Sequence, residues 1–345
     1  MNKGLTYDDI ALIPQYNNVP SRLEPNFSSW LTKNVQIGLP ILPANMDCVI
    51  GPELARVLHK NNGIPIFHRF TGNDTMLKWL KLFPRSFVSS GVGEKDLDFI
   101  EHLLREGVPF LGVCLDIAHG HSKMMKDSII HVKDMAEGFG RPIDIIAGNV
   151  CTPQAYQDLV SWGADAVKVG IGGGAACTTR GVTGFGVPQF TAVHECAKIA
   201  NKLRIPIIAD GSIRSSNDIV KALAAGASTV MAGKIFAATS ESSAQKQNIA
   251  FRPNAEPVWQ ARYRGQASEE FQIEQFGKVK EGTVPEGEGM WVPVTGSAQT
   301  LIDRLLGGLR TGFTYGGARS IKELQRKAEF IEVTNMYAVE SGVRK

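Results

Sequence analysis

The chain has 345 residues, of which 43% are hydrophobic and 21% are charged, and its formal net charge is +3. These are ordinary values for a globular protein, and the length allows one large domain or two smaller ones. A charge this close to balance gives no indication of a nucleic-acid groove or a membrane surface, although it leaves room for a local basic pocket.

The cysteines and the N-terminal sequence indicate the cellular compartment of the protein. The five cysteines include no CxxC pair, which argues against a disulfide framework and against a structural zinc site. Residues 1–14 lack the basic start and apolar core of a signal peptide, and no apolar run approaches the roughly 20 residues that span a bilayer. We therefore expect a protein of the reducing cytoplasm.

In chain order, short apolar runs alternate with amphipathic stretches. The expected strands are residues 40–44, 65–68, 87–91, 110–116, 144–150, 166–172, 206–210 and 229–233. The expected helices include residues 51–60, 94–105, 122–138, 152–162, 188–203 and 216–225. Nearly continuous apolar runs suit parallel strands that are covered on both faces. Eight such alternations predict an α/β fold of the (β/α)8 (TIM) barrel type, with residues 1–345 forming a single domain.

Two segments interrupt this alternation. Residues 178–188 are expected to form a loop after the sixth strand, and residues 250–294 form a long segment rich in Gly, Glu, Gln and Pro. A loop this long in a compact domain is usually a lid or is disordered. We therefore expect residues 250–294 to form a flap over the active site.

Polar residues and glycines gather where the expected strands end. They are Asn45, Asp47, His68, Asp116, Asn149, Gly172, Asp210 and Gly233. In a (β/α)8 barrel the active site is built at the carboxyl ends of the strands. This set therefore predicts where the active site lies.

The most informative segment is the glycine-rich run 169–180, which follows the sixth expected strand and contains Cys177 and Arg180. Its glycines let the backbone approach a ligand or an ion closely. A nearby positive charge favours the thiolate form of a cysteine, so we interpret Cys177 as a nucleophile. The alternative is a tight turn beside a buried structural cysteine. Cys114 and Cys196 lie inside an expected strand and helix, and we interpret them as core residues.

The ends of the seventh and eighth strands predict a phosphate site. Asp210, Gly211 and Ser212 follow one strand, and Gly233 and Lys234 follow the other. In this fold these two loops often hold a phosphate, because glycine permits close approach and helix N-termini supply amides. The two carboxylate oxygens of Asp210 suit a pair of ribose hydroxyls. The alternative for Asp210 is a helix cap.

Two further patterns allow more than one interpretation. His119 and His121 form an HxH pair that could bind a metal, but no third ligand is evident nearby. In the flap, residues 263–268 could touch a phosphate or a base, and residues 284–289 place glutamates among glycines. Such a glutamate is a candidate base reader or proton-transfer group, and the alternative is a solvated turn.

One ordered set of motifs runs along nearly the whole chain. It comprises residues 5–14 (LTYDDIALIP), 44–47 (ANMD), 116–122, 147–150 (AGNV), 170–180 with CTTR, 183–189 (TGFGVPQ), 210–211, 263–268 and 305–318 (LLGGLRTGFTYGGA). With this set the chain resembles the IMP dehydrogenase and GMP reductase family. The resemblance implies a cysteine thiolate that attacks C2 of a purine nucleotide monophosphate, and a hydride that moves between C2 and a nicotinamide. The dehydrogenase branch then hydrolyses the covalent adduct. The reductase branch expels ammonia from GMP and reduces the adduct with NADPH.

Three features favour the reductase branch of this family. Arg69 leads directly through residues 77–83 to the third strand, which leaves no room for the regulatory domain that the dehydrogenase usually inserts there. Residues 265–285 contain no arginine and no tyrosine, whereas the dehydrogenase activates water with an Arg-Tyr pair on its flap. Hydrolysis needs a base, so without one the adduct is expected to persist. The ANMD motif is the reductase-like form.

The resemblance also implies roles for individual residues. Cys177 is the nucleophile, and Thr179 and Glu286 protonate the leaving ammonia. The residues that bind the nucleotide are Asp210, Gly211, Ser212, Gly233, Lys234, Gly265, Gln266, Ala267 and Gly287. The residues that contact NADPH, some of them from a neighbouring subunit, are Ser21, Arg22, Arg69, Asp116, Ile117, Ala118, Ile171, Gly172, Thr311, Gly312, Phe313 and Thr314. A monovalent cation such as K⁺ is held by Gly172, Gly174, Cys177 and Arg180. The family is usually tetrameric, which implies a homotetramer.

The chain departs from the family pattern at several positions. Gly173, Gly174 and Ala175 replace the usual Pro-Gly-Ser, and Lys234 stands where glycine or serine is usual. We expect Lys234 to replace the lost phosphate contact with a charge-assisted one. Gln266 stands where methionine is common, and residues 116–121 have the dehydrogenase-like form, so the nucleotide could be a deoxy or modified guanylate. NADPH-dependent reduction of GMP is the leading hypothesis. Oxidation of IMP with NAD, and a nucleotide-binding regulator without turnover, are the alternatives.

Overall fold

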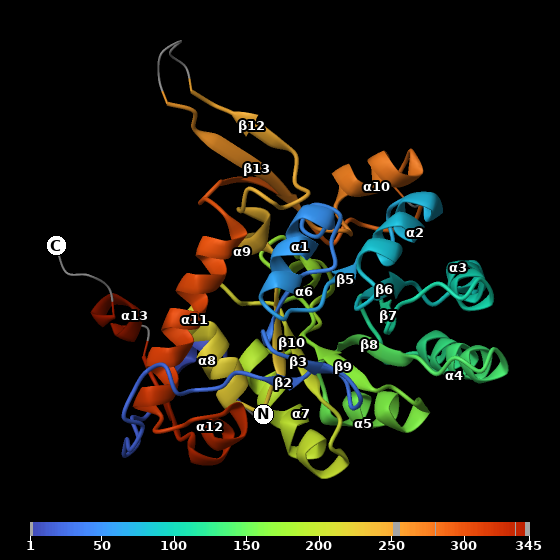
Figure 1. Cartoon of the computed structure of the whole chain (residues 1–345). Helices are drawn as coiled ribbons and strands as arrows, with labels where there is room; N and C mark the ends of the chain where they lie inside the picture. The colour runs from blue at the N-terminus through green and yellow to red at the C-terminus, as the bar shows by residue number, and fades with distance from the viewer. Residues whose placement is uncertain (1–2, 251–255, 280, 335, 342–345) are drawn as a thin grey trace.

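Eight parallel strands form the centre of the fold (Figure 1). The computed structural model describes residues 3–250, 256–279, 281–334 and 336–341. In sheet order the strands are β4 (Ile41–Pro43), β11 (Thr229–Ala232), β10 (Ile207–Asp210), β9 (Ala166–Val169), β8 (Asp144–Val150), β7 (Gly112–Asp116), β6 (Phe87–Ser90) and β5 (Ile66–Phe67). Every neighbouring pair is parallel. The sheet is therefore a nearly closed barrel, and the predicted (β/α)8 fold is confirmed.

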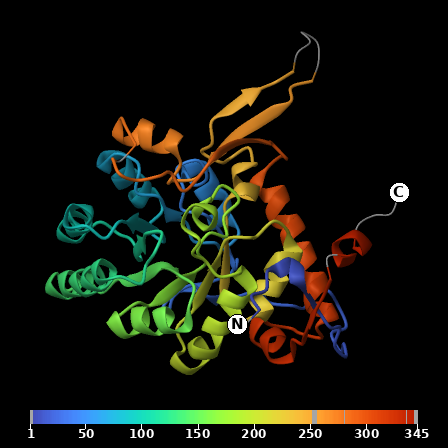
Figure 2. The ribbon, with the colours of Figure 1, turned by 180° about the vertical axis from the view of Figure 1, so that it is seen from behind.

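Helices cover the outside of the barrel and connect successive strands (Figure 1). They are α1 (Pro52–Lys60), α2 (Asn73–Leu82), α3 (Glu94–Arg105), α4 (Lys123–Gly138), α5 (Pro153–Trp162), α7 (Gln189–Leu203), α8 (Ser216–Ala224) and α11 (Ala298–Tyr315). The hydroxyl of Thr152 caps α5 by accepting a hydrogen bond from the Ala155 amide, and Gly163 ends it with a φ of 116°. Figure 2 shows the teal and green helices α3 to α5 on the side of the barrel opposite to the red-orange α11. Within the described ranges, no helix is both long and apolar enough to pass through a bilayer.

The barrel interior has its own core, separate from the layer beneath the helices. Its buried side chains come from alternate strand positions and include Leu42, Cys114, Ile146, Ala166, Ile208 and Met231. Leu31 and Ile37, from the hairpin of β2 (Ser29–Trp30) and β3 (Gln36–Ile37), belong to the same cluster. The Ser29 hydroxyl donates to the carbonyl of Ser228, which lies just before β11. The hairpin therefore covers the amino-terminal end of the barrel, opposite to the end at which active sites of this fold are built.

The segment expected as a long loop contains regular structure. The strands β12 (Lys246–Asn248), β13 (Trp259–Arg264) and β14 (Gly289–Pro293) form an antiparallel sheet, and β12 and β13 extend away from the barrel (Figure 1). The helix α10 (Glu269–Phe276) lies between β13 and β14 in sequence, and its N-cap Ser268 accepts a hydrogen bond from the Phe271 amide. The described part of residues 250–294 therefore contains strands and a helix; residues 251–255 and 280 lie outside the described residues. Residues 178–188 likewise contain a short helix, α6 (Thr179–Thr183).

The connection between β5 and β6 is short. Residues 68–72 join β5 to α2, and residues 83–86 join α2 to β6. No further domain is inserted at this point, as the sequence predicts. The N-terminal turn η1 (Tyr7–Asp9) and strand β1 (Ile10–Leu12) lie outside the barrel, where β1 pairs with β15 (Phe330–Glu332).

Candidate active site

A cavity of about 320 Å³ opens at the carboxyl ends of the barrel strands. Its lining includes Asn45 after β4, Asp116 at the end of β7, Asn149 in β8 and Asp210 at the end of β10. The cavity therefore lies where the polar strand ends predict the active site. Three members of that predicted set, Asp47, His68 and Gly233, do not line this cavity.

The loop after β9 carries Cys177 into the cavity. Gly170 has a φ of 148°, and a Cβ placed on it would lie 2.0 Å from the carbonyl oxygen of Asp210. Only glycine lets the loop pass this close to β10. The Arg180 guanidinium donates to the carbonyls of Ile171 at 3.1 Å and Val187 at 2.7 Å. Arg180 therefore holds the two ends of the loop together.

Cys177, Thr179 and Glu286 form a chain of hydrogen bonds inside the cavity. The Cys177 thiol donates to Thr179 Oγ1 over 3.1 Å, and Thr179 Oγ1 donates to Glu286 Oε2 over 2.8 Å. Thr179 and Glu286 are 107 positions apart in the sequence. A hydroxyl that accepts from a thiol and donates to a carboxylate can pass a proton between them. The three residues predicted to be catalytic therefore lie together.

Backbone contacts hold the Glu286 segment against the Cys177 loop. The Thr178 amide donates to the Glu286 carbonyl over 2.9 Å, and Cys177 and Gly287 form an isolated antiparallel bridge. A Cβ on Gly287 would lie 3.1 Å from the carbonyl oxygen of Ala176. Gly287 was predicted to bind the nucleotide, but it does not line the cavity. In this structure it allows the flap to approach the Cys177 loop.

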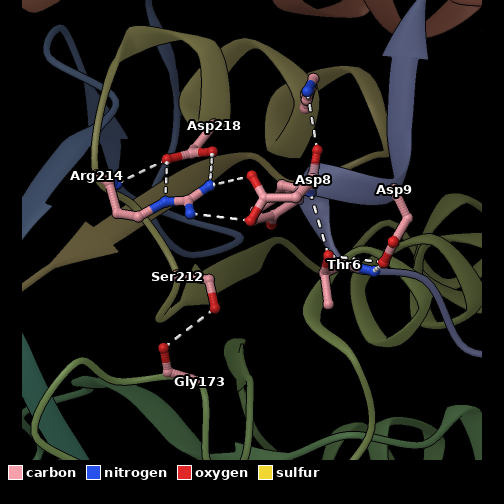
Figure 3. Close-up of polar contacts among 9 residues, drawn as sticks. Thr6, Asp8, Asp9, Gly173, Ser212, Arg214 and Asp218 are labelled. Carbon is pink, nitrogen blue, oxygen red and sulfur yellow. Dashed lines mark hydrogen bonds and ion pairs between the residues drawn. The ribbon is translucent and has the colours of Figure 1, made fainter. Parts of the chain in front are cut away.

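The loop after β10, predicted to hold phosphate, packs against the glycine-rich loop. Ser212 has a φ of 60°, and its amide and hydroxyl donate to the Gly173 carbonyl over 2.8 and 3.1 Å (Figure 3). Gly211 precedes it with a φ of 104°, and a Cβ there would lie 2.9 Å from the Gly173 carbonyl carbon. The two loops thus meet through backbone atoms.

Arg214 fixes the same loop from its far side (Figure 3). Its guanidinium donates to both carboxylate oxygens of Asp8, at 2.9 and 2.6 Å, and to both oxygens of Asp218, at 3.1 and 2.9 Å. Such paired contacts to planar carboxylates are geometrically specific. Because Asp8 belongs to η1 and Asp218 to α8, Arg214 joins the N-terminal segment to the predicted phosphate loop.

The other predicted phosphate residues lie at α9 (Lys234–Ala237). Lys234 is exposed, and a Cβ on Gly233 would lie 2.5 Å from Tyr263 Oη. Gly211, Ser212, Gly233 and Lys234 do not line the cavity beside Cys177, whereas Tyr263 does. Burial raises the pKa of the Tyr263 phenol, so it remains a hydrogen-bond donor at neutral pH.

Three predicted nucleotide residues, Gly265, Gln266 and Ala267, line the cavity on the flap side. The Gln266 side chain donates from Nε2 to the carbonyl of Asn45 over 3.0 Å. This bond spans from the flap to the end of β4. The position at which the chain departs from the family's usual methionine is therefore part of the cavity wall.

A buried lysine that the sequence analysis did not single out also lines the cavity. Lys168 Nζ lies 2.8 Å from Asp116 Oδ1 and 3.0 Å from Asp210 Oδ2, and the Lys168 side chain is 2% exposed. Burial disfavours the charged form of Asp116, but Lys168, together with Asn45 and Arg69, outweighs this effect, and the pKa of Asp116 lies below its usual value. The sequence signal for Lys168 is a lone lysine in the otherwise apolar strand β9.

Half of the predicted cofactor residues line the same cavity. They are Arg69, Asp116, Ile117, Ala118, Ile171 and Gly172. Asn149 Oδ1, in the cavity wall, is buried and has no hydrogen-bond partner among the described residues. A donor group on a ligand would satisfy this acceptor.

The other predicted cofactor residues lie away from this cavity. Arg22 and Thr314 line a separate surface pocket with Tyr315, and Ser21 is exposed next to Arg22. The ring of Phe313 is fully buried and packs edge-on against Phe27, with 5.0 Å between ring centroids. Thr311 and Gly312 precede Phe313 on α11. A cofactor role for this group stays a prediction.

Three of the other four cysteines, Cys48, Cys114 and Cys196, are buried in the core. Burial raises the pKa of Cys48, Cys114 and Cys196 to about 12, so their thiols stay protonated at neutral pH. The core role predicted for Cys114 and Cys196 agrees with their full burial.

Neither predicted metal position has a cluster of ionisable ligands. Over the part of the chain that the structure describes, no group of three His, Cys, Asp or Glu residues could hold a metal ion. His121 of the HxH pair is paired with Asp158 at 2.8 Å. Gly172, Gly174 and Cys177 lie on one loop. In this loop the Gly174 carbonyl accepts a hydrogen bond from the Cys177 amide over 3.0 Å. Their role as carbonyl ligands of a monovalent cation, with Arg180, stays a prediction.

The fold and this site define a (β/α)8-barrel protein in which a cysteine on a glycine-rich loop is linked through a threonine to a glutamate. A family model described as the IMP dehydrogenase / GMP reductase domain matches residues 4–344. The chain therefore belongs to the IMP dehydrogenase and GMP reductase family, whose members are oxidoreductases.

Relatives from both branches of the family are similar to this chain. It is 33% identical to inosine-5'-monophosphate dehydrogenase of Cryptosporidium parvum, in an alignment that covers 99% of this chain and 95% of the relative. It is 36% identical to GMP reductase of Helicobacter pylori strain J99, covering 96% of this chain and 97% of the relative. It is 35% identical to human GMP reductase 1, covering 96% of each chain. These similarities do not choose between the two reactions.

Proposed function

We propose that the protein is an NADPH-dependent reductase that converts GMP, or a close analogue such as dGMP, to IMP and ammonia. The observation that carries this proposal is the hydrogen-bonded chain from Cys177 through Thr179 to Glu286. It offers a nucleophile and a proton donor for a leaving amine in one place. Residues 265–285 contain no arginine and no tyrosine that could activate water for hydrolysis.

The steps of the proposed reaction use these three residues in turn. Glu286 accepts the thiol proton through Thr179, and the Cys177 sulfur forms a bond to C2 of the purine while the C2=N3 π electrons move to N3. The Thr179–Glu286 pair then gives a proton to the 2-amino group, the C2–nitrogen bond breaks, and ammonia leaves. A bound nicotinamide cofactor would supply a hydride to C2; the C2–sulfur bond would then break, which would give IMP and regenerate the Cys177 thiolate.

The nucleotide is proposed to lie between Cys177 and the barrel strand ends. Asp210 would accept hydrogen bonds from the ribose, and Gln266 would lie beside the base. The loops containing Ser212 and Lys234 would hold the phosphate. The Arg214 contacts to Asp8 and Asp218 support this placement, because they fix the phosphate loop before the ligand binds.

NADPH is proposed to bind along the part of the cavity that includes Asp116, Ala118 and Gly172. When bound, it supplies the hydride. The unpaired acceptor Asn149 Oδ1 fits the amide donor of a nicotinamide. We also propose a cytoplasmic homotetramer in which a neighbouring subunit brings its Arg22 and Thr314 to the cofactor, with a K⁺-like cation at the Cys177 loop. The surface pocket that gathers Arg22 and Thr314 away from the cavity supports this arrangement.

A second candidate function is the oxidation of IMP with NAD. It is favoured by the dehydrogenase-like sequence of residues 116–121 and by the similarity to the Cryptosporidium parvum dehydrogenase. The test follows NADPH absorbance with GMP, and in parallel the reduction of NAD with IMP. We expect NADPH to be consumed only with GMP. Formation of NADH with IMP would overturn the proposal, as would tight nucleotide binding without turnover in either direction.

A further inference from the structure

We propose that Lys168 is a positioning residue that keeps the carboxylates of Asp116 and Asp210 charged side by side, each as the acceptor for one of two ligands. Lys168 Nζ lies 2.8 Å from Asp116 Oδ1 and 3.0 Å from Asp210 Oδ2. Its own side chain is 2% exposed, whereas both carboxylates are 20% exposed. The ammonium is therefore hidden, and the two carboxylates are the parts that a ligand can reach.

The two carboxylates come from strands that are not neighbours. Asp116 ends β7 and Asp210 ends β10, with β8 and β9 between them in the sheet. Their nearer oxygens are at most about 6 Å apart, because both contact the same Nζ atom. Two carboxylates this close in a partly buried site repel each other, and without a cation one of them retains a proton.

Neutral donors complete the arrangement on each side. Asn45 Nδ2 donates to Asp116 Oδ2 and Asn149 Nδ2 donates to Asp210 Oδ2, each over 2.9 Å. Asp210 Oδ1 has no hydrogen-bond partner from the described residues, and it remains available for a ligand. Amides orient a carboxylate but do not neutralise it, whereas the Lys168 ammonium contacts both carboxylates directly.

Other ionisable groups nearby do not replace this ammonium. Cys114 lies close to Lys168, and burial raises its pKa to about 12, so it is neutral at the pH values of interest. Tyr263, near Asp210, has a pKa raised by burial and is also neutral. Arg69 interacts with Asp116, but its side chain is 33% exposed and pairs with Asp96 at 3.3 Å. Cys177 and Glu286 are the remaining ionisable residues of the cavity lining.

This inference rests on the proposed function only for the identity of the ligands. In the proposed reaction Asp210 faces the nucleotide and Asp116 faces the cofactor. Lys168 touches neither in this arrangement and acts through both carboxylates. Loss of Lys168 is therefore expected to lower the affinity for both ligands, and the size of this effect should depend on pH.

The test compares Lys168→Met with the double variant Lys168→Met/Asp116→Asn, which restores the original net charge of the cluster. GMP affinity is measured from pH 5.5 to 8.5 and expressed relative to wild type, so that ionisation of the ligand cancels. We expect Lys168→Met to bind GMP at least tenfold more weakly at pH 6, with the deficit shrinking as the pH rises. The double variant should lose this pH dependence and bind more tightly than Lys168→Met. A deficit that is equal at every pH, or no recovery in the double variant, would overturn the proposal.

A second measurement needs neither ligand nor turnover, and it separates this proposal from the proposed function. Without Lys168 a carboxyl pKa in the folded state is raised, which favours the folded state at low pH. The deficit in melting temperature of Lys168→Met relative to wild type should therefore shrink between pH 8 and pH 5. The matched control is Lys221→Met, which removes a second lysine that is 3% exposed and donates to the Tyr7 carbonyl outside the cavity. Lys168→Arg keeps the charge and should keep the wild-type pH profile. The same pH-independent deficit in Lys168→Met and Lys221→Met would mean that Lys168 has only a packing role.

Discussion

Thr179 Oγ1 lies 2.8 Å from Glu286 Oε2, so one hydroxyl connects the Cys177 thiol to a carboxylate on the flap. Glu286→Gln keeps the size and an acceptor oxygen but cannot take up a proton at neutral pH. We expect the rate of ammonia release to fall about 100-fold while GMP affinity changes little. Release of isotope-labelled ammonia measures this step directly. Glu288→Gln, an exposed neighbour on the same segment, is the control and should remain near wild type. Ammonia release at the wild-type rate in Glu286→Gln would remove this carboxylate from the mechanism.

Lys234 is the exposed first residue of α9, in the loop predicted to hold phosphate. If it replaces the hydroxyl that is missing at Ala175, Lys234→Ala should weaken GMP binding about tenfold, which is the usual size of one charge-assisted contact. Guanosine, which lacks the phosphate, should bind equally to both proteins. Lys202→Ala, at an exposed position near the end of α7, is the control. Unchanged GMP affinity in Lys234→Ala would refute the role.

Arg264 joins the flap to the barrel. Its Nη2 lies 2.7 Å from Asp47 Oδ2, and its guanidinium lies 5.3 Å from the Phe271 ring centroid on α10. Arg264→Met leaves Asp47 without this partner, so we expect the flap to dock less often. The KM for the nucleotide should rise about tenfold, and limited proteolysis within residues 265–279 should be faster. Arg56→Met, which removes an exposed ion pair on α1, is the control. Cleavage of the flap at the wild-type rate would contradict this interpretation.

His68 is buried in its neutral form, since its Nδ1 accepts a hydrogen bond from the Phe70 amide at 3.1 Å. Burial lowers the pKa of His68 to about 4, although the negative charge of Asp47 acts in the opposite direction. An unfolded histidine titrates near pH 6.5, so the unfolded state binds more protons between pH 4 and 6.5. The stability contributed by neutral His68 is present above pH 6.5 and is lost as the pH falls.

We therefore expect His68→Asn, which keeps an acceptor at this position, to reduce the pH dependence of stability. Between pH 7.5 and pH 5 the wild-type protein should lose about 2 kcal/mol more unfolding free energy than the variant. Urea unfolding at the two pH values measures this difference. His131→Asn, on the exposed side of α4, should behave like wild type. Equal losses in His68→Asn and wild type would show that His68 is not the titrating group.

The barrel could be predicted from the sequence because parallel strands covered on both faces appear as continuous apolar runs. Residues 144–150, for example, coincide with β8. The flap strands could not be predicted in the same way. In β13, apolar and polar residues alternate, but burial does not follow this alternation: Ala261 and Tyr263 are buried, whereas Trp259 is 47% exposed. The sheet they form depends on pairing with β12 and β14, and a local pattern does not contain that information.

The predicted catalytic residues are the part of the site that the structure brings together most closely. Cys177, Thr179 and Glu286 could be placed because each belongs to a motif. Lys168 could not be predicted as a site residue, because its role depends on contacts with Asp116 and Asp210, which are 52 and 42 positions away in the sequence. A lysine in an apolar strand indicates a buried charge, but only the folded barrel supplies its partners.

The central claim is that the Cys177 thiolate attacks the purine ring, and Cys177→Ala tests it most directly. NADPH oxidation is followed with GMP for this variant and for Cys151→Ala, a half-buried cysteine that does not line the cavity. We predict that Cys177→Ala loses hydride transfer while GMP still binds, and that Cys151→Ala retains it. Turnover near the wild-type rate in Cys177→Ala would contradict the account.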